Sequence, residues 1–139
     1  MLYSRALPEF FATSLAALAP PVRSLLRIIS GLLFLEHGTG KFLGFPQLPH
    51  LPPVGSMAWY GGIPELVGGA LLVLGQFSRP VAFLLSGEMA VAYWIAHAPR
   101  DPFPAINGGD AAILYCFVFL YIAVAGPGQW SLDARRGRA

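Results

Sequence analysis

The stretch from Arg27 to Lys41 constrains the fold of this chain more than any other part. Its first half is almost entirely apolar, and its second half carries three ionisable side chains, Glu36, His37 and Lys41. The hydrophobic run around it, 22–43, has roughly the 20 residues that a helix needs to cross a bilayer. Ionisable groups inside a membrane are costly unless they are paired or hydrated. This stretch therefore predicts both a membrane span and a functional site.

The composition is that of a membrane protein. Of 139 residues, 55% are hydrophobic and 12% are charged, about half the charged fraction of a typical soluble domain. The formal net charge of +2 comes from basic residues scattered at segment ends, without a basic patch, so no nucleic acid partner is expected. The single cysteine, Cys116, cannot form an intramolecular disulfide or a Cys-x-x-Cys pair. The expected surroundings are a lipid bilayer.

Three further apolar segments follow the first, and proline-rich or glycine-rich stretches separate them. The predicted spans are 22–43, 61–75, 81–97 and 107–125. Pro64 is compatible with the second span because it falls in the first helical turn. The predicted fold class is therefore all-α, an integral membrane four-helix transmembrane bundle. Gly61, Gly68 and Gly75 recur every seven residues, with Gly62 and Gly69 beside them, and such a stripe lets helix backbones approach closely.

Residues 1–21 resemble a signal peptide, but Pro20 and Pro21 follow the would-be cleavage point and a full span comes directly afterwards. We therefore expect a short N-terminal interfacial helix. The predicted organisation is an N-terminal segment 1–21, a membrane domain 22–126 and a basic tail 127–139.

Positive charges divide unequally between the two ends of the spans. Lys41 and Arg100 fall at one end, and the other end carries the remaining basic residues, Arg5, Arg23, Arg27, Arg79, Arg135, Arg136 and Arg138. The positive-inside rule then places both termini in the cytoplasm of a multi-pass protein of the bacterial inner membrane.

With this topology, the polar residues of all four spans fall in the outer half of the bilayer. The candidate catalytic residues are Glu36, His37, Glu65 and Asp110, and the candidate ligand-binding residues are Lys41, Tyr60, Glu88, Trp94, His97 and Asn107. Several carboxylates and one ammonium group cannot all be charged cheaply in a low dielectric, so we expect a proton to be shared among the candidate catalytic residues. The predicted site is an outward-facing pocket for a small polar ligand or a quinone head group.

Structural roles could also explain these residues. A buried ion pair of Lys41 with Glu65 or Asp110 can fix helix register. Tyr60 and Trp94 suit an aromatic belt at the membrane surface. No two histidines have a local ligand spacing, so no metal site is predicted.

Three motifs resemble the DoxX family of small four-helix bacterial membrane proteins. They are Arg27-x3-Gly31-x2-Phe34-x2-His37-Gly38-x2-Lys41, Glu65-x2-Gly68-Gly69-x2-Leu72-x2-Gly75, and Asn107-Gly-Gly-Asp110 with the later Gly126-Pro-Gly-Gln-Trp-Ser-Leu-Asp133. The family often has Glu at the position of Asp110, which keeps the carboxylate. The resemblance implies a four-helix bundle in the inner membrane. It also implies a role in redox chemistry, either as the membrane subunit of thiosulfate:quinone oxidoreductase or as a partner of enzymes that handle thiol and oxidative stress.

Three functions stay open at this point. The first is a quinone-linked redox component, an oxidoreductase whose electrons come from a partner protein or a soluble substrate, because the chain encodes no covalently held cofactor. The second is a noncatalytic subunit that assembles or stabilises a protein complex or a homo-oligomer. The third is a small transporter, for which a four-helix bundle is narrow.

Overall fold

The structure, a computed structural model, describes residues 13–137. Within this range all regular secondary structure is helical, which confirms the predicted all-α class. The helices are α2 (Ala19–Leu43), α3 (Met57–Tyr60), α4 (Gly62–Leu74), α5 (Ser78–Ala92), the π-helical turn η1 (Tyr93–His97), α6 (Pro104–Asn107), α7 (Asp110–Ala125) and α8 (Leu132–Arg135).

The first long helix begins three residues before the predicted span. Pro20 and Pro21 lie in the first turn of α2, where the missing amide hydrogens break no helical bond. Residues 13–17 are also helical. Most of the expected N-terminal interfacial segment, residues 1–12, lies outside the described residues.

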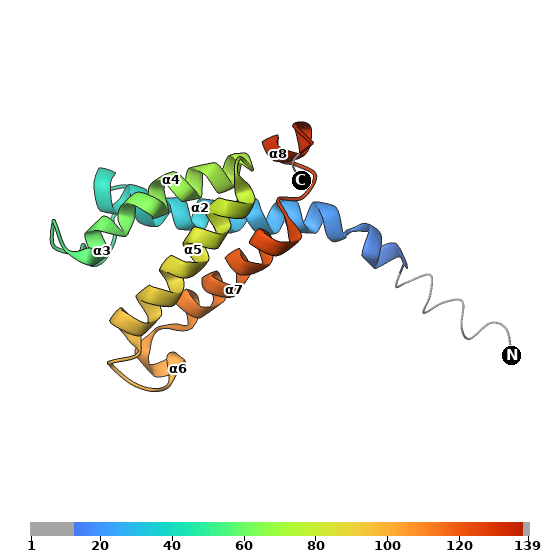
Figure 1. Cartoon of the computed structure of the whole chain (residues 1–139). Helices are drawn as coiled ribbons and strands as arrows, with labels where there is room; N and C mark the ends of the chain where they lie inside the picture. The colour runs from blue at the N-terminus through green and yellow to red at the C-terminus, as the bar shows by residue number, and fades with distance from the viewer. Residues whose placement is uncertain (1–12, 138–139) are drawn as a thin grey trace, which may run out of the picture.

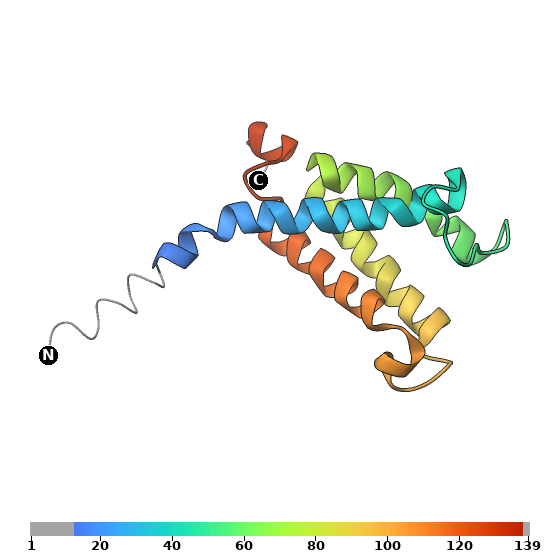
Figure 2. The same cartoon turned by 180° about the vertical axis from the view of Figure 1, so that it is seen from behind.

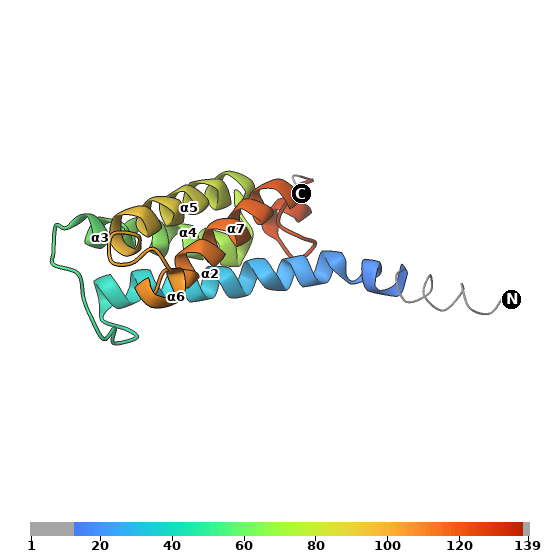
Figure 3. The ribbon, with the colours of Figure 1, turned by 90° about the horizontal axis from the view of Figure 1, so that it is seen from below.

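The long helices form two antiparallel pairs, α2 with α4 and α5 with α7. The pairs meet near the turn between α4 and α5 and diverge from there, as Figure 1 and the view from behind in Figure 2 show. We call the end where α2 begins and α7 finishes the termini end, and the opposite end the loop end. Figure 3 shows the connection from α2 to α3 and the short helix α6 at the loop end.

One helical stretch among residues 13–137 is both long enough and apolar enough to cross a membrane. It is Met57–Leu74, with a mean hydropathy of 1.4. The apolar helix α7 is shorter, at 16 residues. The helix α2 has 25 residues, but charged side chains interrupt it along its length. The four expected helical regions are therefore present, and one of them is a clear span by length and composition.

The backbones of α2 and α4 approach most closely at glycines that differ from the predicted stripe. A Cβ atom on Gly38 would lie 2.5 Å from the backbone nitrogen of Leu66, and one on Gly69 would lie 2.8 Å from the Cα atom of Leu35. Gly68, a member of the predicted stripe, instead faces the side chain of Leu85 on α5. The close pairing of α2 with α4 thus depends on Gly38 and Gly69.

An apolar core joins the two helix pairs. Phe34 of α2 contacts Phe119 of α7 edge to face, with ring centroids 5.0 Å apart. Leu72 and Leu85, from α4 and α5, are fully buried in the same cluster. This core holds the two helix pairs together near the turn between α4 and α5, before the pairs diverge toward the loop end.

The termini end is closed by hydrogen bonds to main-chain groups. The buried guanidinium of Arg27 donates to the carbonyl oxygens of Leu72, Val73, Pro127 and Trp130. The carboxylate of Asp133 accepts the amide hydrogens of Phe77, at 3.0 Å, and Ser78, at 2.8 Å. The region predicted as a basic tail thus begins with residues 127–135 packed against the bundle.

Candidate functional site

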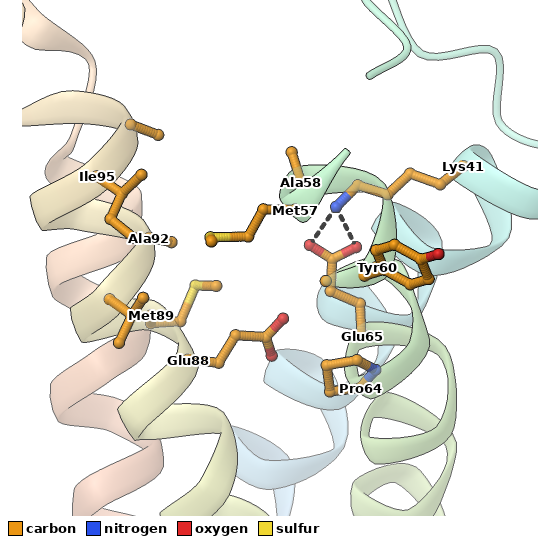
Figure 4. A pocket seen from close by; sticks show the side chains of 13 residues that line it. Lys41, Met57, Ala58, Tyr60, Pro64, Glu65, Glu88, Met89, Ala92 and Ile95 are labelled. Carbon is orange, nitrogen blue, oxygen red and sulfur yellow. Dashed lines mark hydrogen bonds and ion pairs between the residues drawn. The ribbon is translucent and has the colours of Figure 1, made fainter. Parts of the chain in front are cut away.

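A buried ion pair joins α2 to α4 at the loop end. Lys41 lies in the last turn of α2, and Glu65 lies in the first turn of α4. The Lys41 Nζ atom is 2.7 Å from each carboxylate oxygen of Glu65, and the side chains are 13% and 10% exposed (Figure 4). Each charge lies at the helix end whose partial charge is opposite, which stabilises both ions. The pair links the end of α2 to the start of α4.

Glu88 of α5 is a second carboxyl group in this region. Its side chain reaches from α5 toward the ion pair, as the close view in Figure 4 shows. The Oε2 atom is buried and has no hydrogen-bond partner among residues 13–137. A buried polar oxygen without a partner is costly, so Glu88 is suited to hydrogen bonding with a bound molecule.

A cavity of about 430 Å³ lies between α4 and α5, and we call it the first cavity. Its acidic and basic side chains are Lys41, Glu65 and Glu88. The rest of the lining is mostly apolar and includes Met57, Tyr60, Met89 and Ile95. Because Tyr60 and Ile95 are exposed on the outside of the helices, the cavity opens on the side of the bundle. Apolar walls with a few convergent polar groups are typical of small-molecule sites.

A second cavity of about 290 Å³ lies between α2 and α7. Its polar lining consists of His37, Glu65, His97 and Tyr115. His97 Nδ1 lies 3.1 Å from the carbonyl oxygen of Asn107. Since a carbonyl oxygen only accepts, Nδ1 is the donor and Nε2 is the nitrogen that can accept a proton.

The π-helical turn η1 contributes to both cavities. The amide of Ala98 donates to the carbonyl oxygen of Tyr93 at 2.9 Å, which closes the wider turn. Ile95 and Ala96 face the first cavity, and His97 faces the second. Single π-helical turns occur frequently at functional sites, where they redirect side chains.

The structure places four candidate residues outside both cavities. Glu36 and Asp110 are exposed and line neither of them. Trp94 is 71% exposed on the surface of η1. Asn107 is buried, but its amide group donates to the Asp101 carbonyl oxygen and accepts from the Gly109 amide. Asn107 therefore orders the loop between η1 and α7.

The remaining candidates come together around Glu65. Lys41, Tyr60, Glu65 and Glu88 line the first cavity, and His37, Glu65 and His97 line the second. Sequence reasoning missed the two methionines of the first cavity, Met57 and Met89, since nothing in the sequence distinguishes them from lipid-facing residues. No group of three or more His, Cys, Asp or Glu side chains among residues 13–137 is arranged to hold a metal ion.

Fold and site together define a small helical protein with two cavities at one end, each with a few polar groups. Residues 22–98 match the model of the DoxX family. An uncharacterized protein of Haemophilus influenzae is 42% identical over 120 residues, which cover 82% of this chain and 90% of the relative. An uncharacterized membrane protein of Mycobacterium tuberculosis is 30% identical over 148 residues, which cover 87% of this chain and 85% of that protein. No solved structure matches the chain. The chain belongs to the DoxX family and is a membrane protein.

Proposed function

We propose that this protein is a quinone-linked redox component of a bacterial inner membrane, and that the first cavity binds the quinone head group. In this proposal the long helices form a four-helix transmembrane bundle with the termini end in the cytoplasm. The observation that carries the proposal is a largely apolar cavity, open on the side of the bundle, whose polar groups converge at one place.

The distribution of side chains supports the membrane arrangement. Large apolar residues cover the outward faces of the long helices, among them Leu32, Phe83, Phe117 and Val124, which are 49% to 73% exposed. Such faces suit acyl chains better than water. Arginines gather at the termini end, where Arg23 donates to the carbonyl oxygen of Ala125 and Arg79 to that of Val124. This charge pattern favours a cytoplasmic termini end.

The first cavity fits the chemistry of a quinone. A quinone head group presents two carbonyl oxygens that accept hydrogen bonds, and its tail is apolar. The Lys41 ammonium group is a donor, and Glu88 in its acid form is a second donor. The buried Glu88 Oε2 atom without a partner marks the place where a bound polar group would lie. Met57, Met89 and Ile95 supply apolar contacts for the ring and the start of the tail.

The residues of the cavity also suit proton handling. Two-electron reduction of a quinone takes up two protons, and the electrons come from a soluble reductant or a partner protein. Lys41 and Glu88 are the side chains on the cavity wall that can give a proton to the head group. Glu65 balances the charge of Lys41 at 2.7 Å and keeps its ammonium group directed into the cavity. This chain thus orients the head group and supplies protons.

The alternative is a noncatalytic subunit that assembles or stabilises a partner complex. The Lys41–Glu65 pair favours it, because the same pair links two helices that pack along each other. This alternative predicts that Glu88 can be neutralised without consequence for ligand binding.

The test is quinone retention by purified protein. We expect wild-type protein in mild detergent to carry a quinone detectable by mass spectrometry, and Glu88→Leu, which removes the hydrogen-bonding group, to retain at least about tenfold less. Glu36→Leu is the matched control, because Glu36 is exposed and lines neither cavity. Thermal unfolding shows whether each variant is folded. Binding of bulk lipid alone, or equal retention by folded Glu88→Leu, would refute the quinone site and favour the noncatalytic alternative.

A further inference from the structure

Glu65 lines both cavities of the loop end. Met89 and Ala92 also line both cavities, but they are apolar. Among the described residues, Glu65 is therefore the ionisable side chain that the two cavities have in common. Its carboxylate contacts Lys41 on the side of the first cavity. His37 lies within electrostatic range of the same carboxylate on the side of the second.

The second cavity differs from the first in its lining. Its polar groups are two imidazoles, the Tyr115 side chain and Glu65, and its other walls are apolar or small, with Phe34, Met89, Ala92, Gly108, Ala111 and Ala112. His37 and Gly108 are exposed, so the cavity opens toward the loop end. A volume of about 290 Å³ holds several waters, each of which occupies about 30 Å³ in the liquid.

From this arrangement we propose that the second cavity is a water-filled proton path from the aqueous phase at the loop end to Glu65, with His37 and His97 as its proton-carrying side chains. The proposal deepens the proposed function and rests on it for the use of the protons. The path ends at the ion pair, whose other side faces the first cavity.

The transfer can be followed atom by atom. Lys41 gives a proton from Nζ to the ligand oxygen and becomes a neutral amine. A proton from water enters at an imidazole nitrogen, for which His97 Nε2 is available, and passes to a Glu65 carboxylate oxygen. Glu65 then returns it to Lys41 Nζ, 2.7 Å away. No atom is gained or lost beyond the proton that water supplies, and two such cycles meet the demand of a two-electron reduction.

Other ionisable groups line the cavities that Glu65 lines. They are Lys41 and His37 on α2, Tyr60 on α3, Glu88 on α5, His97 on η1 and Tyr115 on α7. Of these, Lys41, Tyr60 and Glu88 line the first cavity alone, and His37, His97 and Tyr115 line the second cavity alone.

Cysteine accessibility tests whether the second cavity contains water. In a Cys116→Ser background, Ala112→Cys places a thiol in the second cavity, although Ala112 is only 7% exposed. Ala90→Cys is the matched control, since Ala90 is partly buried in α5 and lines neither cavity. In proteoliposomes, a charged, membrane-impermeant thiosulfonate should label Ala112→Cys at least about tenfold faster than Ala90→Cys. Equal or slower labelling would overturn the proposal.

A kinetic measurement tests the two histidines. We expect the His37→Ala, His97→Ala double variant to retain quinone like wild type, and its bound quinone to be reduced at least about fivefold more slowly by dithionite. Added imidazole should restore the rate, which a merely structural defect would not show. Unchanged reduction, or slow reduction that imidazole does not rescue, would refute the histidine path. A wild-type protein without quinone would refute the proposed function, whereas the labelling result would still decide whether the second cavity is wet.

Discussion

Glu65 and Glu88 show how two similar carboxyl groups acquire different roles from their surroundings. Glu65 lies in the first turn of α4 and contacts an ammonium group with both carboxylate oxygens. Glu88 lies in the middle of α5, and its Oε2 atom has no partner among residues 13–137. The first group is therefore held in place by the protein itself, and the second is free to interact with a ligand.

At the scale of single residues, we predict strong coupling between Lys41 and Glu65. Lys41→Met leaves a buried carboxylate without its cation and should destabilise the protein by about 3–5 kcal/mol. Glu65→Gln in the same chain removes that unpaired charge, so the double variant should recover most of the loss. Unfolding in detergent for the four members of the cycle measures the coupling.

Strictly additive effects in this cycle would contradict the prediction. Glu36→Gln serves as the control on the same helix, because Glu36 is exposed. It should change the free energy of unfolding by less than about 0.5 kcal/mol.

At the scale of helices, the α2–α4 pair depends on the absence of side chains at its closest contact. In Gly38→Ala, the new methyl group would lie 2.5 Å from the backbone nitrogen of Leu66, and backbone cannot move aside as a flexible side chain can. We expect a loss of about 2–3 kcal/mol from overpacking, measured by thermal unfolding. The lost contact should also weaken the Lys41–Glu65 pair nearby.

Gly87→Ala is the matched substitution in α5. Among residues 13–137, no heavy atom outside the neighbouring turns of α5 lies within 4 Å of the added Cβ atom, and alanine has the higher helix propensity. This variant should be as stable as wild type or more stable by up to about 1 kcal/mol. A Gly38→Ala protein as stable as Gly87→Ala would refute the close packing of α2 on α4.

The docking of α8 should depend on pH. Burial raises the pKa of the Asp133 carboxyl, but hydrogen bonds from Ser78 and Phe77 and the charge of Arg136 outweigh it, so the pKa lies below its ordinary value. A pKa that is lower in the folded state stabilises that state at higher pH. The contribution is complete above about pH 4, near the unfolded pKa, and it is lost as the pH falls through the folded pKa.

Asp133→Asn isolates this contribution. We expect the variant to be less stable than wild type by about 1.5–3 kcal/mol at pH 7, because it loses hydrogen bonds to a charged acceptor. The difference in unfolding midpoint between the two proteins should shrink as the pH is lowered below 4. A difference that stays constant from pH 7 to pH 2 would show that Asp133 does not titrate as part of this contact.

For the whole molecule, we predict that both termini lie in the cytoplasm and that the loop end faces outward. A fluorescent protein fused after Ala139 should fluoresce in cells. Val54→Cys in a Cys116→Ser background should react with an impermeant thiol reagent added outside, because Val54 is 84% exposed in the loop after α2. Labelling of Val54→Cys only after the cells are permeabilised would reverse the orientation.

Much of the fold could be predicted from the sequence, because prolines and glycines separate its apolar segments. The main difference at the first helix is that α2 begins at Ala19, since prolines are compatible with a first turn. The pairing of Lys41 with Glu65 could be foreseen as one of two ion pairs, because opposite charges fall at the same level of neighbouring helices.

The direction in which each side chain points could not be predicted from the sequence. In a helix surrounded by lipid, apolar residues occupy every side, so the pattern does not reveal that Glu36 faces outward while Glu65 faces the cavities. Which side chains face a cavity depends on how the two helix pairs diverge. That divergence is a property of helix packing. The positive-inside pattern predicts on which side Arg27 lies, but it does not predict its hydrogen-bond partners, because these are main-chain carbonyl groups, which any sequence provides.

The hydrogen bonds of Arg27 have a consequence for the order of events during synthesis. Two of its acceptors belong to Pro127 and Trp130, which lie 100 and 103 residues further along the chain. At about 5–20 residues per second, the ribosome reaches them roughly 5–20 s after it has made Arg27. For that time the guanidinium must stay hydrated or be shielded by the insertion machinery. The first helix therefore reaches its final place only after the last one has been made.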